Sequence, residues 1–147
     1  MHSIKNIRGA ALCCCMDGRA HSGMQWYALG RFGIRHIDRI AVEPGCDRFF
    51  KDNPAHFETH YKDRLFKIAL LHHDVRVIFL VGHDDCLGYP VSKEEHMAAI
   101  TKGVNLISEW DFPITEKITI VGLWAYEIDP ETEEWEATLV AHKEINV

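Results

Sequence analysis

Two short motifs, far apart in the chain, could supply metal ligands and carboxylates to a common site. Residues 15–19 read CMDGR and residues 82–86 read GHDDC. Each motif directly follows a short apolar run, residues 10–14 in the first case and residues 77–81 in the second. Runs of this length and composition predict buried strands. If both strands lie parallel in one sheet, their carboxyl ends share the edge at which open α/β sheets bind ligands.

Cys15, His83 and Cys86 are the candidate metal ligands within these motifs. Cys15 stands where its strand is expected to end, and His83 and Cys86 lie three positions apart in a turn that begins with glycine. Two thiolates and one imidazole with an open fourth position form a known catalytic zinc set. A His-x-x-Cys spacing alone is common, so the prediction of a Zn²⁺ site depends on both motifs standing at strand ends. If Asp17 instead filled the fourth position, the site would be a structural zinc site in a noncatalytic binding module.

The cysteines also allow a second interpretation, a redox protein with reactive thiols at Cys13, Cys14, Cys15 or Cys46. No Cys-x-x-Cys spacing is present, which disfavours a thioredoxin-like protein. Free cysteines are often buried as small apolar side chains, so we expect Cys13 and Cys14 to be core residues of their strand. Five cysteines, three of them consecutive, form no disulfide framework and favour a protein of the reducing cytoplasm.

The composition is that of a small soluble enzyme. A chain of 147 residues is expected to fold as a single domain, residues 1–147, with a substantial core. The net charge of -6 argues against a nucleic-acid-binding surface, and no apolar run reaches the roughly 20 residues that span a bilayer. The first eight residues lack the architecture of a signal peptide. We therefore expect a cytoplasmic protein with a small-molecule substrate, and neither nucleic acid nor membrane as a partner.

The elements that must position the two motifs alternate between strands and helices. Strands are expected at residues 10–15, 37–42, 76–81, 117–126 and 135–141. A short helix is expected at about residues 21–29, and a longer one begins near Pro54 with the apolar stripe Phe57, Tyr61, Leu65, Ile68 and Ala69. Ser92 can cap a third helix, whose stripe is Met97, Ile100, Val104, Ile107 and Trp110. This order predicts an α/β fold: a mostly parallel β-sheet flanked by helices on both faces, with a C-terminal antiparallel strand.

The spacing Cys-x-Asp-x-Arg, followed much later by Gly-His-x-x-Cys, resembles that of the β-class carbonic anhydrases. The segment IVGLWAYEI at residues 120–128 is similar to the closing strand and hairpin of that family, and the resemblance extends over most of the chain from about residue 10. It implies that Cys15, His83 and Cys86 ligate Zn²⁺. It also implies a parallel α/β sheet and the reversible hydration of carbon dioxide to bicarbonate by zinc-bound hydroxide.

Asp17 and Arg19 would form the catalytic dyad beside the metal in this resemblance. The planar guanidinium fork of Arg19 matches a carboxylate. Paired with Arg19, Asp17 would accept a hydrogen bond from the zinc-bound hydroxide and orient it. Released from Arg19, Asp17 could occupy the fourth zinc position and shut the site. The alternative is an ordinary surface ion pair. Asp84 and Asp85 are expected to hold their turn rather than relay protons.

The sequence departs from the family in the region that lines the substrate pocket. The family's Arg-Asn-Ala-Gly-Asn-like loop corresponds to VEPGC at residues 42–46, and its Cys-Gly-Gly corresponds to CLG at residues 86–88. Members of this family with altered pockets include hydrolases of carbon disulfide and carbonyl sulfide. These two compounds are therefore the alternative substrates.

The family assembles as dimers or multiples of dimers, which implies a homodimer or higher homo-oligomer here. Family members carry N-terminal helices that embrace the partner subunit, and few residues precede the first expected strand. We therefore expect the contact to involve the sheet edge or the helix at residues 57–71. An apolar pocket at this contact would be lined by aromatic side chains that are otherwise ordinary core residues, namely Trp26, Tyr27, Phe49 and Phe50.

Overall fold

The computed structural model describes residues 9–147, which form a five-stranded sheet of order β2-β1-β3-β4-β5. The strands are β1 (Ala10–Cys13), β2 (Ile37–Ala41), β3 (Val77–His83), β4 (Ile118–Asp129) and β5 (Glu134–Ile145). β1 pairs in parallel with β2 and β3, β3 pairs in parallel with β4, and β4 pairs antiparallel with β5. The predicted mostly parallel sheet with a C-terminal antiparallel strand is confirmed.

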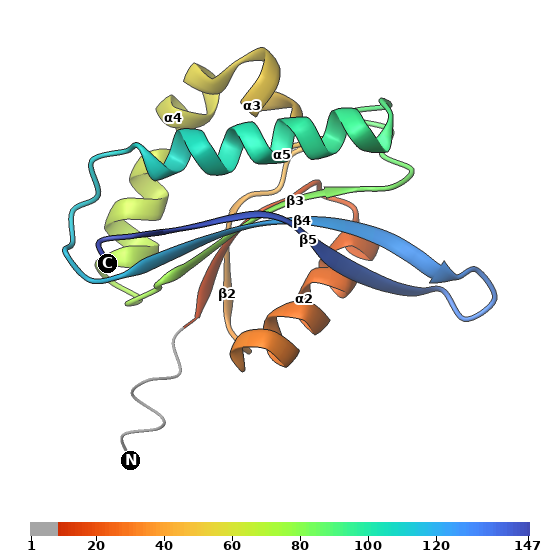
Figure 1. Cartoon of the computed structure of the whole chain (residues 1–147), viewed down its shortest axis with the longest axis horizontal. Helices are drawn as coiled ribbons and strands as arrows, with labels where there is room; N and C mark the ends of the chain where they lie inside the picture. The colour runs from red at the N-terminus through yellow and green to blue at the C-terminus, as the bar shows by residue number, and fades with distance from the viewer. Residues whose placement is uncertain (1–8) are drawn as a thin grey trace.

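Helices cover both faces of this sheet, as predicted (Figure 1). α2 (Gly18–Phe32) packs on one face. The other face carries α3 (Arg48–Asp52), α4 (Pro54–Asp63), the π-helix η1 (Arg64–Leu70) and α5 (Lys93–Ser108). Because successive strand residues point to opposite faces, β1 contributes Cys13 to the core beneath α4 and α5 and Leu12 to the core against α2.

The helix α2 begins at Gly18, within the first motif and three residues earlier than predicted. Asp17 is its N-cap, with a side-chain oxygen that accepts a hydrogen bond from the backbone N–H of Arg19. The helix ends at Gly33, which has a φ of 68° and donates its backbone N–H to carbonyls of the last turn. The cap explains why the helix starts early. Its hydrogen bond also fixes the backbone of Asp17 and Arg19 within the motif.

The long helix that begins at Pro54 changes its hydrogen bonding halfway along. From Arg64 it is π-helical, and the backbone N–H of Leu71 bonds to the carbonyl of Phe66, five residues earlier. The wider turn shifts the buried face, so Ile68 is 48% exposed and its place in the core is taken by Leu70. The predicted burial of Ile68 is wrong for this reason. The other members of the stripe are buried, namely Phe57, Tyr61, Leu65 and Ala69.

The helix α5 begins where its cap was predicted. The Ser92 hydroxyl accepts a hydrogen bond from the backbone N–H of Glu95 at 3.2 Å. Most of its predicted stripe is buried, whereas Met97 lies at the margin of the core. The buried position in the first turns is taken instead by His96. A polar side chain in this place needs its own explanation.

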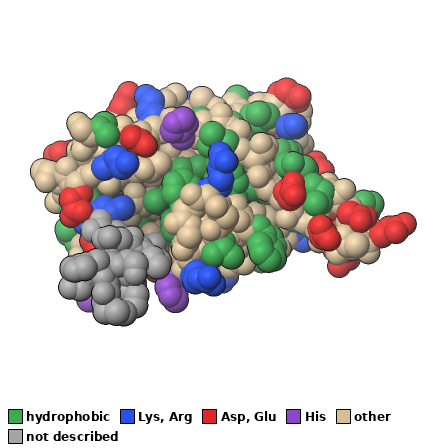
Figure 2. Space-filling view, turned by 60° about the horizontal axis from the view of Figure 1, so that its bottom comes forward, with side chains coloured by type: hydrophobic (Ala, Val, Ile, Leu, Met, Phe, Trp, Pro, Cys, Tyr) green, Lys and Arg blue, Asp and Glu red, His purple; other side chains and the backbone are tan. Residues whose placement is uncertain are grey.

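The strands β4 and β5 are longer than predicted and extend as a hairpin beyond the helices (Figure 1). Acidic side chains gather on this projecting end, as Figure 2 shows. The ten residues 127–136 contain six acidic and no basic side chains. Among the residues that the structure describes, no helix is long and apolar enough to cross a membrane.

Candidate metal centre

The carboxyl edge of the sheet brings the two motifs together. β1 and β3 are parallel neighbours, with Cys13 in register with Leu80. The chain leaves β1 through Cys14 and reaches Cys15, while β3 ends at His83 on the same edge. The predicted meeting of residues 15–19 and 82–86 at one sheet edge is therefore what the structure contains.

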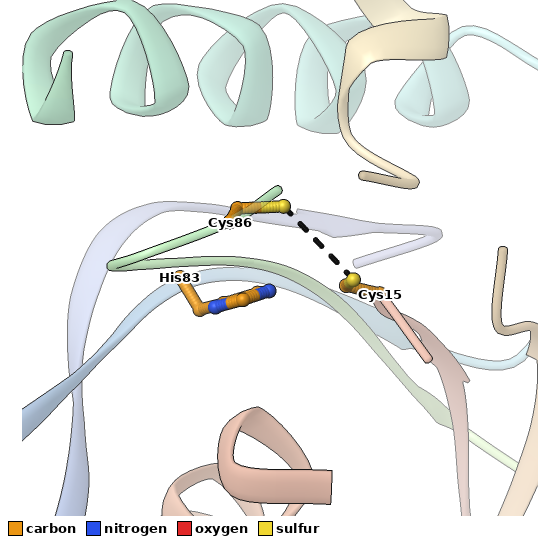
Figure 3. Close-up of side chains that lie close together, drawn as sticks. All are labelled: Cys15, His83 and Cys86. Carbon is orange, nitrogen blue, oxygen red and sulfur yellow. Dashed lines mark hydrogen bonds between the residues drawn. The ribbon is translucent and has the colours of Figure 1, made fainter. Parts of the chain in front are cut away.

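Cys15, His83 and Cys86 form a cluster that could hold a metal ion, the one such group found among the described residues. Their ligand atoms all lie within 4.8 Å of one another, and the side chains point toward a common centre (Figure 3). The two Sγ atoms are 3.9 Å apart. Two zinc–sulfur bonds of about 2.3 Å at a tetrahedral angle would place the sulfurs about 3.8 Å apart. The three residues are almost fully buried, with exposed fractions of 5%, 1% and 5%. The cluster thus has the donor set and the dimensions of a tetrahedral metal site.

The ring of His83 is held in the tautomer that a metal requires. Nδ1 lies 2.6 Å from the backbone carbonyl oxygen of Asp84. A carbonyl oxygen can only accept a hydrogen bond, so the ring proton is on Nδ1. In the neutral ring, Nε2 then carries a free lone pair, and it is buried without a hydrogen-bond partner in the described part of the chain. A buried lone pair of this kind fits a metal ion, and metal-bound histidines are typically fixed in this way through the other ring nitrogen.

Before a metal binds, the two thiols of the cluster differ strongly in acidity. The hydrogen bond from Cys86 lowers the pKa of Cys15 to about 3. The same contact raises the pKa of Cys86, because ionising it would place a second negative charge beside the first. Burial lowers the pKa of His83, but the nearby Cys15 sulfur and the Asp84 carbonyl outweigh this and leave the pKa above its usual value. The cluster is thus already anionic at Cys15 and attracts a cation.

A backbone N–H and a histidine side chain hold Cys15 from two sides. The N–H of Gly45 donates a hydrogen bond to Cys15 Sγ at 3.3 Å, and His21 Nε2 lies 2.8 Å from the Cys15 carbonyl oxygen. Gly45 has a φ of 59°, and an added Cβ there would lie 2.5 Å from the carbonyl carbon of Gly88. Only glycine fits this close approach. The loop that departs from the family pattern therefore supplies a hydrogen-bond donor to the cluster of Cys15, His83 and Cys86.

Asp17 and Arg19 lie beside the cluster as a tight pair. Arg19 Nη2 is 2.6 Å from Asp17 Oδ2, and Arg19 Nε donates to both carboxylate oxygens at 3.0 and 3.1 Å. These hydrogen bonds lower the pKa of Asp17, so its carboxylate stays ionised. Arg19 also reaches Asp85 Oδ2 at 3.3 Å. The pair is thus bidentate and fixed to both motifs, which distinguishes it from an isolated surface ion pair.

Trp135 is a residue of this site that the sequence did not reveal. It comes from β5, and its ring lies under the Arg19 guanidinium, with Arg19 Cζ 5.0 Å from the ring centroid. The same ring packs edge-on against His83, with centroids 6.3 Å apart. Trp135 is only 4% exposed. Its position depends on the pairing of the hairpin, and no spacing between Trp135 and either motif signals it.

The remaining cysteines are core residues, as expected for Cys13 and Cys14. Burial raises the pKa of Cys13, Cys14 and Cys46. Thiols that ionise with difficulty are poor nucleophiles. The redox interpretation therefore has no support from these three residues.

A comparison with known protein families gives a match over residues 6–141 to the family described as "Putative carbonic anhydrase". The chain belongs to this carbonic anhydrase family. No protein of curated function matches the sequence significantly.

Solved carbonic anhydrases share the fold of this family member. One is the carbonic anhydrase from Glaciozyma antarctica, with 16% identity and a TM-score of 0.53, covering 92% of this chain and 84% of that one. Another is a β-carbonic anhydrase, isoform I, from Trichomonas vaginalis, with 17% identity and a TM-score of 0.52, covering 90% of this chain and 82% of that one. At these identities the likeness establishes a β-carbonic anhydrase fold and leaves the chemistry to the site.

Proposed function

We propose that this carbonic anhydrase family member binds Zn²⁺ through Cys15, His83 and Cys86 and catalyses the reversible hydration of carbon dioxide to bicarbonate. The observation that carries the proposal is the buried Cys₂His cluster with an unpartnered His83 Nε2. Zinc bound there would supply a Lewis acid that lowers the pKa of a coordinated water from about 15.7 toward 7. Zinc suits the set because it accepts thiolate and imidazole in a tetrahedral arrangement, whereas Mg²⁺ and Ca²⁺ prefer oxygen ligands.

Asp17 would act in this reaction as a fixed hydrogen-bond acceptor beside the metal cluster. Its carboxylate is ionised because Arg19 lowers its pKa. An ionised carboxylate has no proton to donate and can only accept one. It would therefore receive a hydrogen bond from the attacking oxygen and aim a lone pair of that oxygen at the substrate carbon.

Arg19 would keep Asp17 in its working position. Its hydrogen bonds to the carboxylate, together with its contact with Asp85 and its stacking on Trp135, restrain the pair on several sides. If Asp17 were released, its carboxylate could fill the fourth position of the metal and give the closed, structural site that the sequence also allows. The intact pair favours the open, catalytic arrangement.

The proposal is tested by measuring the zinc content of the purified protein together with its carbon dioxide hydration rate. Asp17→Asn should lower turnover by about 100-fold, the lower range for a positioned proton acceptor, while the zinc content stays near one per chain. Asp63→Asn is a matched control, because Asp63, the last residue of α4, is an exposed carboxylate paired with Lys67 of η1. Zinc-loaded wild-type protein no faster than free zinc between about pH 7 and 9 would contradict the proposal. Carbonyl sulfide and carbon disulfide in the same assay test the alternative substrates.

We also propose that the protein is a homodimer or a higher homo-oligomer. Two large apolar side chains next to the metal ligands are exposed, Met16 at 65% and Leu87 at 93%. Trp26 on α2 is 68% exposed, which fits a contact residue, whereas Phe50 is 1% exposed and belongs to the core. Light scattering should give at least twice the chain mass of 16.9 kDa. A fully active monomer at micromolar concentration would exclude this assembly.

We infer a reducing compartment, such as the cytoplasm, for the protein. All five cysteines are free and buried. Disulfides are rare where cellular thiols keep cysteines reduced, and free thiolates in such compartments commonly serve as metal ligands. Fluorescence microscopy of the tagged protein in its native cell would test the location.

A further inference from the structure

A second buried polar pair lies close to the metal cluster. Among the described residues, three polar or charged side chains are buried: Asp47, His83 and His96. His83 is a candidate ligand, and the other two form a pair in which His96 Nδ1 is 2.6 Å from Asp47 Oδ2. Both side chains are 2% exposed. Burying such groups is unfavourable unless they are paired, so their place in the fold calls for a reason.

The pair joins the loop that contacts Cys15 to the helix α5. Asp47 lies two residues after Gly45, whose N–H donates to Cys15 Sγ. His96 lies in the first turns of α5, where its backbone N–H bonds to the carbonyl of Ser92. The hydrogen bond between Asp47 and His96 therefore ties the Gly45 loop to a helix that packs on the sheet.

The same pair lies against the backbone that carries the other two ligands. A Cβ added at Gly82, the residue before His83, would lie 2.8 Å from Asp47 Oδ2. His96 packs edge-on against Tyr89, with centroids 4.9 Å apart. Tyr89 in turn belongs to the small apolar cluster that contains Cys15 and Cys86. The pair thus contacts the surroundings of all three ligands without being one of them.

We propose that Asp47 and His96 are positioning residues of the metal centre, which hold the Gly45 N–H on the sulfur of Cys15. Asp47 Oδ2 accepts the Nδ1 proton of His96, and this bond fixes the loop at residues 45–47. A hydrogen bond from Gly45 to the thiolate withdraws electron density from a ligand sulfur. In a site with two thiolates, this contact offsets part of the charge that the sulfurs give to the metal. The inference rests on the proposed ligand set and not on the reaction catalysed.

Direct substitution of the donor cannot test this proposal, because Gly45 tolerates no side chain. The pair itself can be altered. His96→Leu removes the donor to Asp47 and keeps an apolar side chain in the core. His96→Asn is the conservative variant, since its amide nitrogen takes the place of Nδ1 and can still donate to Asp47.

The surface pair His73 and Asp38 provides a matched control. His73 Nδ1 lies 2.6 Å from Asp38 Oδ2, the same separation as in the buried pair. Its side chains are 46% and 30% exposed. His73→Leu therefore removes a His–Asp hydrogen bond of the same length without touching the Gly45 loop.

The experiment measures Zn²⁺ affinity by chelator competition and records the thiolate-to-metal charge-transfer band of the Co²⁺-loaded protein. His96→Leu should weaken Zn²⁺ binding roughly 10- to 100-fold, the range for partners that orient metal ligands, and shift the Co²⁺ band. His96→Asn and His73→Leu should stay within about threefold of wild type, with an unchanged band. A merely structural pair would lower the stability of the metal-free and metal-loaded protein equally and leave both readouts unchanged.

Zn²⁺ affinity of His96→Leu within about threefold of wild type, with an unchanged Co²⁺ band, would overturn the inference. If His96→Leu does not fold, Asp47→Leu replaces it, because leucine has a similar shape and no oxygen to accept the Nδ1 proton of His96. The same weakening and band shift are then expected, and their absence overturns the inference. Failure of the wild-type protein to bind Zn²⁺ or Co²⁺ would overturn the proposed function and this inference together. Wild-type binding with no effect of either substitution would overturn the inference alone.

Discussion

The carboxyl and amino edges of the sheet both carry imidazole and charged side chains. The polar atoms of these side chains find their hydrogen-bond partners in different ways at the two edges. At the amino edge, the side chains of the pair His73–Asp38 are partly exposed. At the carboxyl edge, His83 and the pair His96–Asp47 are buried, and His83 Nε2 has no hydrogen-bond partner among the described residues. Charged groups at the first edge need only water. Those at the second need a ligand or each other, which supports the proposed metal site at that edge.

The largest expected effect follows from removing one sulfur at the carboxyl edge. Cys86→Ser should lose zinc and with it the stability that zinc adds, about 4 kcal/mol in the free energy of unfolding at a zinc concentration 1,000 times the Kd. Zinc content and denaturant unfolding with and without added zinc measure the effect.

Cys46→Ser is the control for this substitution, because Cys46 is also buried but contacts the carbonyl of Ala41 rather than the cluster. It should keep one zinc per chain. Equal zinc content in Cys86→Ser and Cys46→Ser would contradict the claim that Cys86 is a zinc ligand and Cys46 is not.

The next effect concerns Arg19, whose planar fork binds both oxygens of Asp17. Arg19→Lys keeps the charge but cannot form the bidentate contact, so Asp17 loses its fixed orientation. Turnover should fall by about 10- to 100-fold while zinc stays bound. Arg31→Lys, at an exposed cation in the last turn of α2 that stacks on Tyr27, is the control and should leave turnover unchanged. Unchanged turnover in Arg19→Lys would show that the pair is structural.

The pH dependence of zinc binding reports on the protons held by the cluster. Cys15 has a pKa of about 3 and is already ionised at neutral pH, whereas the pKa values of Cys86 and His83 are raised. Zinc must displace the proton of Cys86 and, below the raised pKa of His83, a second proton. Affinity should therefore fall as the pH falls, by at least about tenfold per pH unit, because Cys86 must release its proton throughout this range.

Calorimetry in buffers of different ionisation enthalpy counts the protons released on zinc binding. About two protons per zinc are expected at pH 8 to 9, one from Cys86 and one from the water that zinc ionises, and close to two near the usual pKa of histidine, about 6.5, where His83 supplies the second. Affinity that does not depend on pH would mean that other groups bind the metal.

The smallest effect is expected at the amino edge. Asp38→Asn should change the free energy of unfolding by less than about 1 kcal/mol, because exposed ion pairs contribute little. Zinc content and turnover should not change. A large loss of activity would mean that the two edges are not functionally separate.

Much of the fold could be predicted because its signals are local. The apolar runs at residues 10–14 and 77–81 predict buried strands, and Ser92 predicts the start of α5. A strand end fixes the edge at which the next residue stands, so Cys15 and His83 could be placed together from the chain alone. The π-helical turn that exposes Ile68 could not be predicted, since it arises from how the helix packs.

The supporting residues of the site were harder to predict because they depend on tertiary contacts. Asp47 and His96 are far apart in the chain and meet only when α3 and α5 pack on the same face of the sheet. One signal was available: His96 lies four positions before Ile100, on the apolar stripe of its helix. Trp135 reaches Arg19 only through the register of β4 and β5, which the sequence does not determine.

The central claim is that Cys15, His83 and Cys86 hold one zinc with a fourth position free for chemistry. X-ray absorption at the zinc edge tests it most directly. The account predicts two sulfur neighbours at about 2.3 Å and two lighter neighbours near 2.0 Å, one of them the His83 nitrogen. In Asp17→Asn the light neighbours should be unchanged, since Asp17 is not a ligand of the open site. A shell of four sulfurs, or a light neighbour lost in Asp17→Asn, would contradict it.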